Sequence, residues 1–141
     1  MVIFWGLSIG GYITRQFVQS HPDKIYVFGD NLQRKGLGGQ ARELRGEPNA
    51  YGVPTKKSPS MTPTAFFTDT EYLENITAIE LAISKIPLDD RDIIVLPIGT
   101  GRAQLPTRAP KTYKYLIKAL TNLNKFYSRA RGSSGAIGVP Q

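Results

Sequence analysis

Two glycine-rich segments, each placed after an apolar run, carry the residues best suited to ligand binding. The first glycine loop, residues 29–40, reads Gly-Asp-Asn-Leu-Gln-Arg-Lys-Gly-Leu-Gly-Gly-Gln, and the second glycine loop, residues 97–102, reads Pro-Ile-Gly-Thr-Gly-Arg. Glycine lets backbone amides approach a ligand closely, and the amino end of a following helix favours an anion. Together the two loops would hold two phosphate groups.

The candidate ligand-binding residues from these loops are Gly29, Gly36, Leu37, Gly38, Gly39, Gln40, Gly99, Thr100, Gly101 and Arg102. Arg102 is the candidate anion clamp, because a guanidinium can donate paired hydrogen bonds to phosphate oxygens. A glycine after a strand is also common in ordinary turns, so the prediction depends on two such loops occurring in one small domain. Neither loop has the Walker A or the Rossmann glycine spacing, which argues against kinase or classical dehydrogenase chemistry.

Two charged residues are candidates for catalysis. Asp30 is the carboxylate of the first glycine loop and a candidate general base, although an aspartate in a Gly-Asp-Asn turn often caps the turn instead. Lys56 is a candidate nucleophile. Its position beside Lys57 in a polar segment, residues 54–63, is more typical of a solvated surface charge. Arg42 and Arg45 are expected on the surface, or in ion pairs with neighbouring glutamates.

Composition excludes several kinds of site. The chain has 141 residues, which fits one domain, and it contains no cysteine and a single histidine, His21. Thiolate chemistry is therefore absent. A histidine metal cluster or a Ser-His-Asp triad would have to take every imidazole from this single histidine. We expect no metal and no cofactor. The formal net charge of +7 predicts an anionic partner, which could be a nucleotide, a nucleic acid or a membrane surface.

The elements that position these loops can be predicted from apolar spacing. Strands are expected at residues 2–5, 24–28, 50–53 and 92–97, and helices at residues 14–20, 40–45, 70–86 and 111–129. Strands that alternate with helices indicate an α/β domain with a mixed, mainly parallel sheet and helices on its faces. We expect one domain over residues 1–131 and a poorly ordered tail over residues 132–141.

Several details of these elements are specific enough to test. The unbroken apolar run at residues 92–97 favours a central strand, and residues 2–5 read as a short buried strand. Thr68 and Glu71 have the spacing of a capping box, and Leu73 begins the inward stripe of the following helix. The apolar start, residues 1–9, is far shorter than the roughly 20 residues of a membrane span and lacks a basic leader, so we expect a cytoplasmic protein.

The order of these pieces resembles the macrodomain superfamily, which binds ADP-ribose in a three-layer α/β/α fold. Residues 27–31 resemble the family's strand that ends in Asn-Ala-Ala-Asn, and residues 36–46 resemble its glycine-rich loop and helix. Residues 95–101 resemble its later strand and phosphate loop. The segment from residue 29 to residue 56 is also similar to a group of small phage and bacterial proteins.

The resemblance implies roles for particular residues. Asn31 would contact the distal ribose, residues 36–39 would bind one phosphate, and residues 99–101 would bind the other. Tyr12 stands where the family has an aspartate that accepts from adenine, and its ring would instead stack on the base. Gly38 stands where some hydrolysing members carry an acidic residue. The implied function is binding of ADP-ribose or a related nucleotide, either with ADP-ribosyl hydrolase activity or to sequester a nucleotide signal.

Two other kinds of function fit the same sequence. The helix expected at residues 111–129 has lysines on its outer face, which is compatible with a nucleic-acid-binding module whose affinity falls steeply with salt. A structural or interaction protein of a phage particle is the third reading, and it predicts that small nucleotides leave the melting temperature unchanged.

Overall fold

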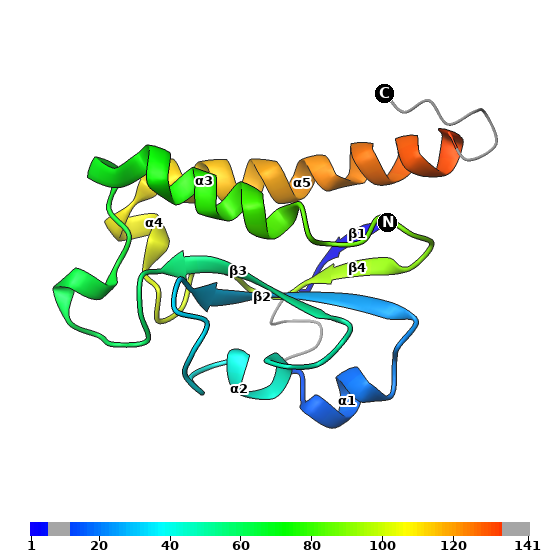
Figure 1. Ribbon diagram of the computed structural model, residues 1–141, viewed down its shortest axis with the longest axis horizontal. Coiled ribbons are helices and arrows are strands. Elements are labelled where there is room, and N and C mark those ends of the chain that lie inside the picture. Colours follow the sequence, from blue (N-terminus) through cyan, green and yellow to red (C-terminus); the bar gives the residue numbers. More distant parts are fainter. Residues whose placement is uncertain (6–11, 134–141) are drawn as a thin grey trace.

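A parallel sheet of four strands forms the centre of the protein (Figure 1). The computed structural model describes residues 1–5 and 12–133, with side chains described up to residue 123. The strands are β1 (Val2–Phe4), β2 (Lys24–Asn31), β3 (Ala50–Lys56) and β4 (Asp92–Val95), in the spatial order β1-β4-β2-β3. All three pairings are parallel, so within the described residues the expected mixed sheet is wrong and the α/β class is confirmed.

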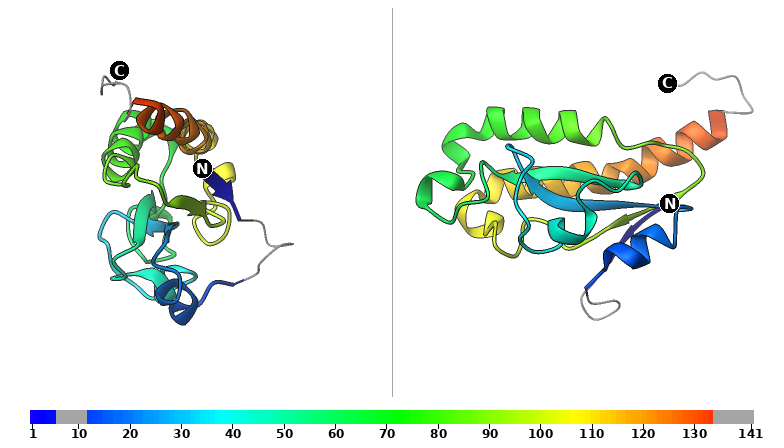
Figure 2. Two further views of the ribbon diagram at one scale, coloured as in Figure 1. Left: turned by 90° about the vertical axis from the view of Figure 1, so that its right-hand side faces the viewer. Right: turned by 60° about the horizontal axis from the view of Figure 1, so that its bottom comes forward.

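Helices cover both faces of the sheet. They are α1 (Arg15–Gln19), α2 (Ala41–Leu44), α3 (Tyr72–Ile83), α4 (Leu105–Arg108) and α5 (Pro110–Ser133), with short 3-10 helices η1 (Pro63–Ala65) and η2 (Asp69–Glu71). Figures 1 and 2 show α3 and α5 on one face and α1 and α2 on the other. The chain moves in one direction across the sheet from β1 to β3 and then returns to β4. Because parallel crossovers are right-handed, this reversal puts α3 opposite α1 and α2.

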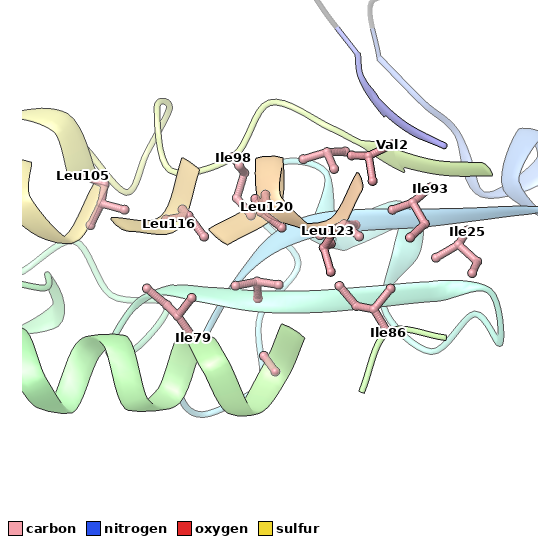
Figure 3. Close-up of a cluster of buried hydrophobic side chains, with 14 of the residues drawn as sticks. Val2, Ile25, Ile79, Ile86, Ile93, Ile98, Leu105, Leu116, Leu120 and Leu123 are labelled. Atoms are coloured by element: carbon pink, nitrogen blue, oxygen red, sulfur yellow. The ribbon is translucent and has the colours of Figure 1, made fainter. Parts of the chain in front are cut away.

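The two inner strands explain the core, because their side chains alternate between the two faces. In β2, Ile25 and Val27 point toward α3 and α5, whereas Tyr26 and Phe28 point toward α1 and α2. β4 repeats this alternation from Ile93 to Val95, and Leu96 continues it just after the strand ends. β4 lies between β1 and β2, as expected of a central strand. Leu116 and Leu120 of α5 fill the larger cluster (Figure 3).

Two of the strands, β2 and β3, are longer at their carboxyl ends than predicted, whereas β1 and β4 end at Phe4 and Val95, before the predicted ends at residues 5 and 97. β2 continues through Asp30 to Asn31, with a register shift between these two residues, and β3 continues to Lys56. Thr55 and Lys56 are therefore buried, and the expectation of a surface loop beginning at residue 54 is wrong. The error arises because polar residues and a proline masked the end of a strand that the sheet buries.

The helix predictions need two corrections. Leu73 is exposed, because α3 begins at Tyr72 and directs Asn75 inward, where the Asn75 amide donates to the carbonyl of Thr68. The predicted capping box does not form, since Thr68 makes no capping hydrogen bond with its side chain. The neighbouring Asp69 is used instead to cap another helix: its carboxylate accepts the amides of the first turn of α5 at 2.8 and 3.0 Å.

The sequence makes predictions for both ends of the chain, a buried strand at the start and a poorly ordered tail at the end. β1 forms as expected, but it is the edge strand of the sheet, and Ile3 and Phe4 are exposed rather than buried. The predicted tail, residues 132–141, lies for the most part outside the described residues.

Candidate functional site

The two glycine loops converge on one cavity of about 350 Å³. The strands before them, β2 and β4, are parallel neighbours, so both loops leave the sheet at the same edge. A Cβ atom at Gly29 would lie 3.4 Å from Cγ1 of Ile98 and 3.8 Å from the amide nitrogen of Gly99. A Cβ atom at Gly38 would lie 3.5 Å from Nε of Arg102. The loops therefore approach each other closely at two places, and residues of both line the cavity.

Most of the predicted ligand-binding residues line this cavity. The lining residues that the sequence analysis named are Gly29, Asp30, Asn31, Gly36, Leu37, Gly38, Gly39, Gln40, Lys56, Gly99, Gly101 and Arg102. Lining residues that it did not name as ligand contacts include Lys35, Ala41, Arg45, Thr55, Pro59 and Ala103. Tyr12 and Thr100 are not lining residues; the Tyr12 hydroxyl donates to the carbonyl of Gly39 at 3.0 Å.

Asp30 holds the start of the first glycine loop through a dense set of hydrogen bonds. Its side chain is only 3% exposed. Arg45 donates to both carboxylate oxygens, at 3.0 and 2.7 Å, and Arg34 donates at 3.1 Å. The amide of Asn31 adds a fourth hydrogen bond at 2.8 Å. Two guanidinium groups and one backbone amide therefore supply hydrogen bonds to both carboxylate oxygens, as in a charge cluster with a structural role.

Arg45 connects the far part of the first glycine loop to this cluster. Besides Asp30, its guanidinium donates to the carbonyls of Gly36 and Lys35, at 3.2 and 3.0 Å. The expected pairing of Arg45 with a neighbouring glutamate is therefore wrong; Glu47 instead pairs with Arg15. Local sequence patterns could not predict this contact, since it depends on α2 returning the chain to the end of β2.

Asn31 supports the same loop from the side. Its amide nitrogen donates to the carbonyl of Lys35 at 2.8 Å, and its amide oxygen accepts from the backbone of Gln33 at 3.0 Å. Gln40 closes the loop, because its amide exchanges two hydrogen bonds of 2.8 Å with the backbone of Ile13. In the structure both side chains therefore have structural partners in addition to their position on the cavity wall.

The second glycine loop is fixed by packing rather than by charge. Gly99 has φ +77°, and a Cβ atom there would lie 3.1 Å from Cδ2 of Leu105, a fully buried residue. The amide of Leu105 donates to the carbonyl of Gly99 at 2.8 Å, which joins the loop to α4. Gly101 has open space around it and lines the cavity. This loop thus rests directly on the core.

Lys56 is the unexpected feature of the cavity wall. The residue is only 7% exposed, which contradicts the reading of a solvated charge. Its ammonium donates to the carbonyl of Ser60 at 2.6 Å and lies 4.7 Å from the centroid of the Phe66 ring. Burial, followed by repulsion from Arg102 and Arg108, lowers the pKa of Lys56 below its ordinary value of 10.5. A lysine with a lowered pKa has a larger neutral, nucleophilic fraction.

The described residues contain neither of two simple structural patterns, a metal-binding cluster and a membrane-spanning helix. No cluster of three His, Asp or Glu residues in residues 1–5 and 12–133 has an arrangement that would hold a metal ion. In the same part of the chain, no helix has the length and apolarity needed to span a bilayer.

The fold and site define an α/β protein with a ligand-sized cavity at the carboxyl edge of a parallel sheet. The chain belongs to a family of unknown function, DUF7831, whose model matches residues 9–119. This match includes both glycine loops and Lys56. No curated protein matches the chain, and no solved structure matches it.

Proposed function

We propose that this protein binds ADP-ribose or a related nucleotide in the cavity between the two glycine loops. The observation that supports the proposal is that both loops, far apart in the sequence, line one cavity of about 350 Å³. This volume lies within the range of roughly 300–1,000 Å³ that small-molecule sites occupy. Loop amides after parallel strands are donors for phosphate oxygens, so each loop would bind one phosphate of a diphosphate.

The charges around the cavity favour an anionic ligand. Asp30 is the one acidic residue among those that line the cavity, and two arginines already neutralise it. Lys56 and Arg102 also line the cavity, and neither has a carboxylate partner within the described residues. A diphosphate entering this cavity would therefore meet an excess of positive charge.

The macrodomain resemblance supplies the identity of the proposed nucleotide and two forms of the function. A sequestering protein would need only the cavity, whereas an ADP-ribosyl hydrolase would need a reactive group beside the ribose.

Between the two catalytic candidates, we favour Lys56, because Asp30 is held by four hydrogen bonds and Lys56 has a lowered pKa. The neutral amine would attack the anomeric carbon, and the leaving group would depart with the bonding electrons and the amine's proton. Water would then release ADP-ribose and return the proton to lysine.

Calorimetric titration with ADP-ribose tests the binding proposal. We expect saturable binding that Gly38→Leu abolishes, because the new side chain would extend from the loop toward Arg102 and the cavity. Thr77→Leu is the matched control, since it adds the same side chain on an exposed position of α3. Absence of binding in the unmodified protein would refute the proposal.

A turnover assay separates the hydrolase from the sequestering protein. ADP-ribosylated protein and ADP-ribosylated nucleic acid are offered as substrates, and release of ADP-ribose is followed by chromatography. A hydrolase that uses Lys56 would lose turnover in Lys56→Met and retain it in Lys57→Met. Binding of ADP-ribose without turnover of either substrate would support the sequestering form.

A second candidate function, nucleic-acid binding, is favoured by one surface of α5. An open groove there is lined by Lys111, Lys114 and Lys118 together with Tyr113 and Ile117. Lysines beside apolar and aromatic side chains fit a phosphate backbone with exposed bases. If this function is correct, neutralising the three lysines should abolish salt-dependent binding of single-stranded DNA, and Gly38→Leu should leave that binding unchanged.

A further inference from the structure

Two cationic side chains, Lys56 and Arg108, lie against the ring of Phe66, and a third, Arg102, lies on the cavity wall near enough for its charge to act on Lys56. The ammonium of Lys56 lies 4.7 Å from the centroid of the Phe66 ring, and Cζ of Arg108 lies 3.7 Å from the same centroid. Arg102 lines the cavity with Lys56, and the charges of both arginines act on the lysine. The three residues come from β3, the second glycine loop and α4, so only the fold brings them together.

This group of three cations, Lys56, Arg102 and Arg108, lacks the acidic partners seen elsewhere in the molecule. Within the described residues, none of the three has a carboxylate within 4.0 Å, whereas Lys57 pairs with Glu71 at 2.6 Å. The hydrogen-bond acceptors of Lys56 and Arg108 within the described residues are neutral: the Ser60 carbonyl and the Met61 sulfur for Lys56, and the Gln104 side-chain oxygen for Arg108. Like charges held close together, with one of them buried, repel each other, and an anion placed among them would relieve that repulsion.

The position of these cations indicates what kind of anion they would meet. Two of them line the cavity that the glycine loops form, so an anion bound there would belong to the same ligand. In the proposed function the loops would bind through backbone amides, whereas the cations offer charged donors suited to a group with two negative charges. Arg108 covers the ring of Phe66 at stacking distance, so this ring is already occupied and is not a platform for a base.

We propose that Lys56, Arg102 and Arg108 form a second anion subsite, distinct from the loop amides, that binds a phosphate monoester carried by the same nucleotide. This inference rests on the proposed function and extends it. The preferred ligand would be a nucleotide with a phosphate in addition to the diphosphate that the loops hold. A dianion at this place would favour the charged form of Lys56, so with such a ligand Lys56 would act as a binding group and not as the nucleophile of the hydrolase form.

Calorimetry on three ligands tests the subsite: ADP-ribose and its two derivatives with one added phosphate, on the adenosine ribose or on the terminal ribose. In the unmodified protein, we expect one derivative to bind at least about 10-fold more tightly than ADP-ribose, which is about 1.4 kcal/mol. Arg108→Gln and Arg102→Gln should each reduce this ratio toward one. Lys85→Gln removes the same charge from an exposed position after α3, and it should retain the full ratio. Equal affinity for all three ligands, or a ratio that persists in both arginine variants, overturns the subsite.

Inorganic phosphate provides a test that does not depend on the nucleotide. At constant ionic strength, phosphate should raise the melting temperature of the unmodified protein and of Lys85→Gln more than that of Arg108→Gln. If no ADP-ribose ligand binds but this difference is seen, the nucleotide proposal fails and the subsite stands. If ADP-ribose binds but phosphate affects all variants equally and the affinity ratio is one, the subsite fails and the nucleotide proposal stands.

Discussion

The two glycine loops reach the same cavity but are supported in opposite ways. The first glycine loop is held by ions and hydrogen bonds centred on Asp30, Arg45 and Asn31. The second is held by contact of Gly99 with the buried Leu105. A polar support can be removed while the core stays packed, whereas an apolar support is part of the core. The first loop is therefore the wall of the cavity that can adjust without repacking the core, and the second loop is the wall that the core holds in place.

The largest effect is expected for Asp30→Ala. It leaves the guanidinium groups of Arg34 and Arg45 without their carboxylate. Breaking a buried pair costs roughly 3–5 kcal/mol; because both arginines keep contact with solvent, we expect a loss of about 3 kcal/mol in the free energy of unfolding. Urea denaturation measures this loss. Asp89→Ala is the matched control, since its pair with Arg91 is exposed and should contribute less than about 1 kcal/mol.

Asp30→Ala should also affect the two loops differently. Amide resonances of residues 32–40 should shift or broaden in Asp30→Ala, while those of residues 97–101 stay near their original positions. If both loops respond equally, or if Asp30→Ala costs no more than Asp89→Ala, then the Asp30 cluster is not the support of the first loop.

A smaller loss of stability is expected for Gly99→Ala. The added methyl group would approach Leu105 at 3.1 Å, and alanine is strained at φ +77°. We expect a loss of about 2 kcal/mol, measured by thermal or urea unfolding. Gly101→Ala serves as the control in the same loop, because nothing lies within 4 Å of its added methyl group. Equal stability of the two variants would show that the second loop is not fixed by the core.

The smallest effect concerns the pH dependence of stability at Lys56. Its pKa is lowered by burial and then by the charges of Arg102 and Arg108, so the unfolded chain binds this proton more tightly than the folded protein does. The free energy of unfolding should therefore rise with pH in the interval below 10.5, relative to Lys56→Met, which lacks the titrating group. Lys57→Met controls for removal of a neighbouring charge. Parallel pH profiles for the unmodified protein and Lys56→Met would contradict a lowered pKa.

The strands and helices whose burial follows a simple apolar pattern could be predicted from the sequence. The apolar runs that became β2 and β4, and the spacing that became α5, follow from burial on one or two faces. The two loops were predicted as well, and their convergence follows from parallel neighbouring strands.

Features that depend on distant contacts could not be predicted. The burial of Lys56 depends on Phe66 and on a strand end disguised by polar residues. The pairing of Asp30 with Arg45 depends on the path of α2. Asp69 was overlooked because its partners lie at the start of α5, more than 40 residues further along the chain.

The central claim is that one nucleotide contacts both glycine loops at once. Titration of ¹⁵N-labelled protein with ADP-ribose, followed through backbone amide resonances, tests it most directly. We predict that the amides of Gly36, Gly38, Gly99 and Gly101 shift together along a single binding curve. Shifts confined to one loop or to α5, or no shifts at all, would contradict the account.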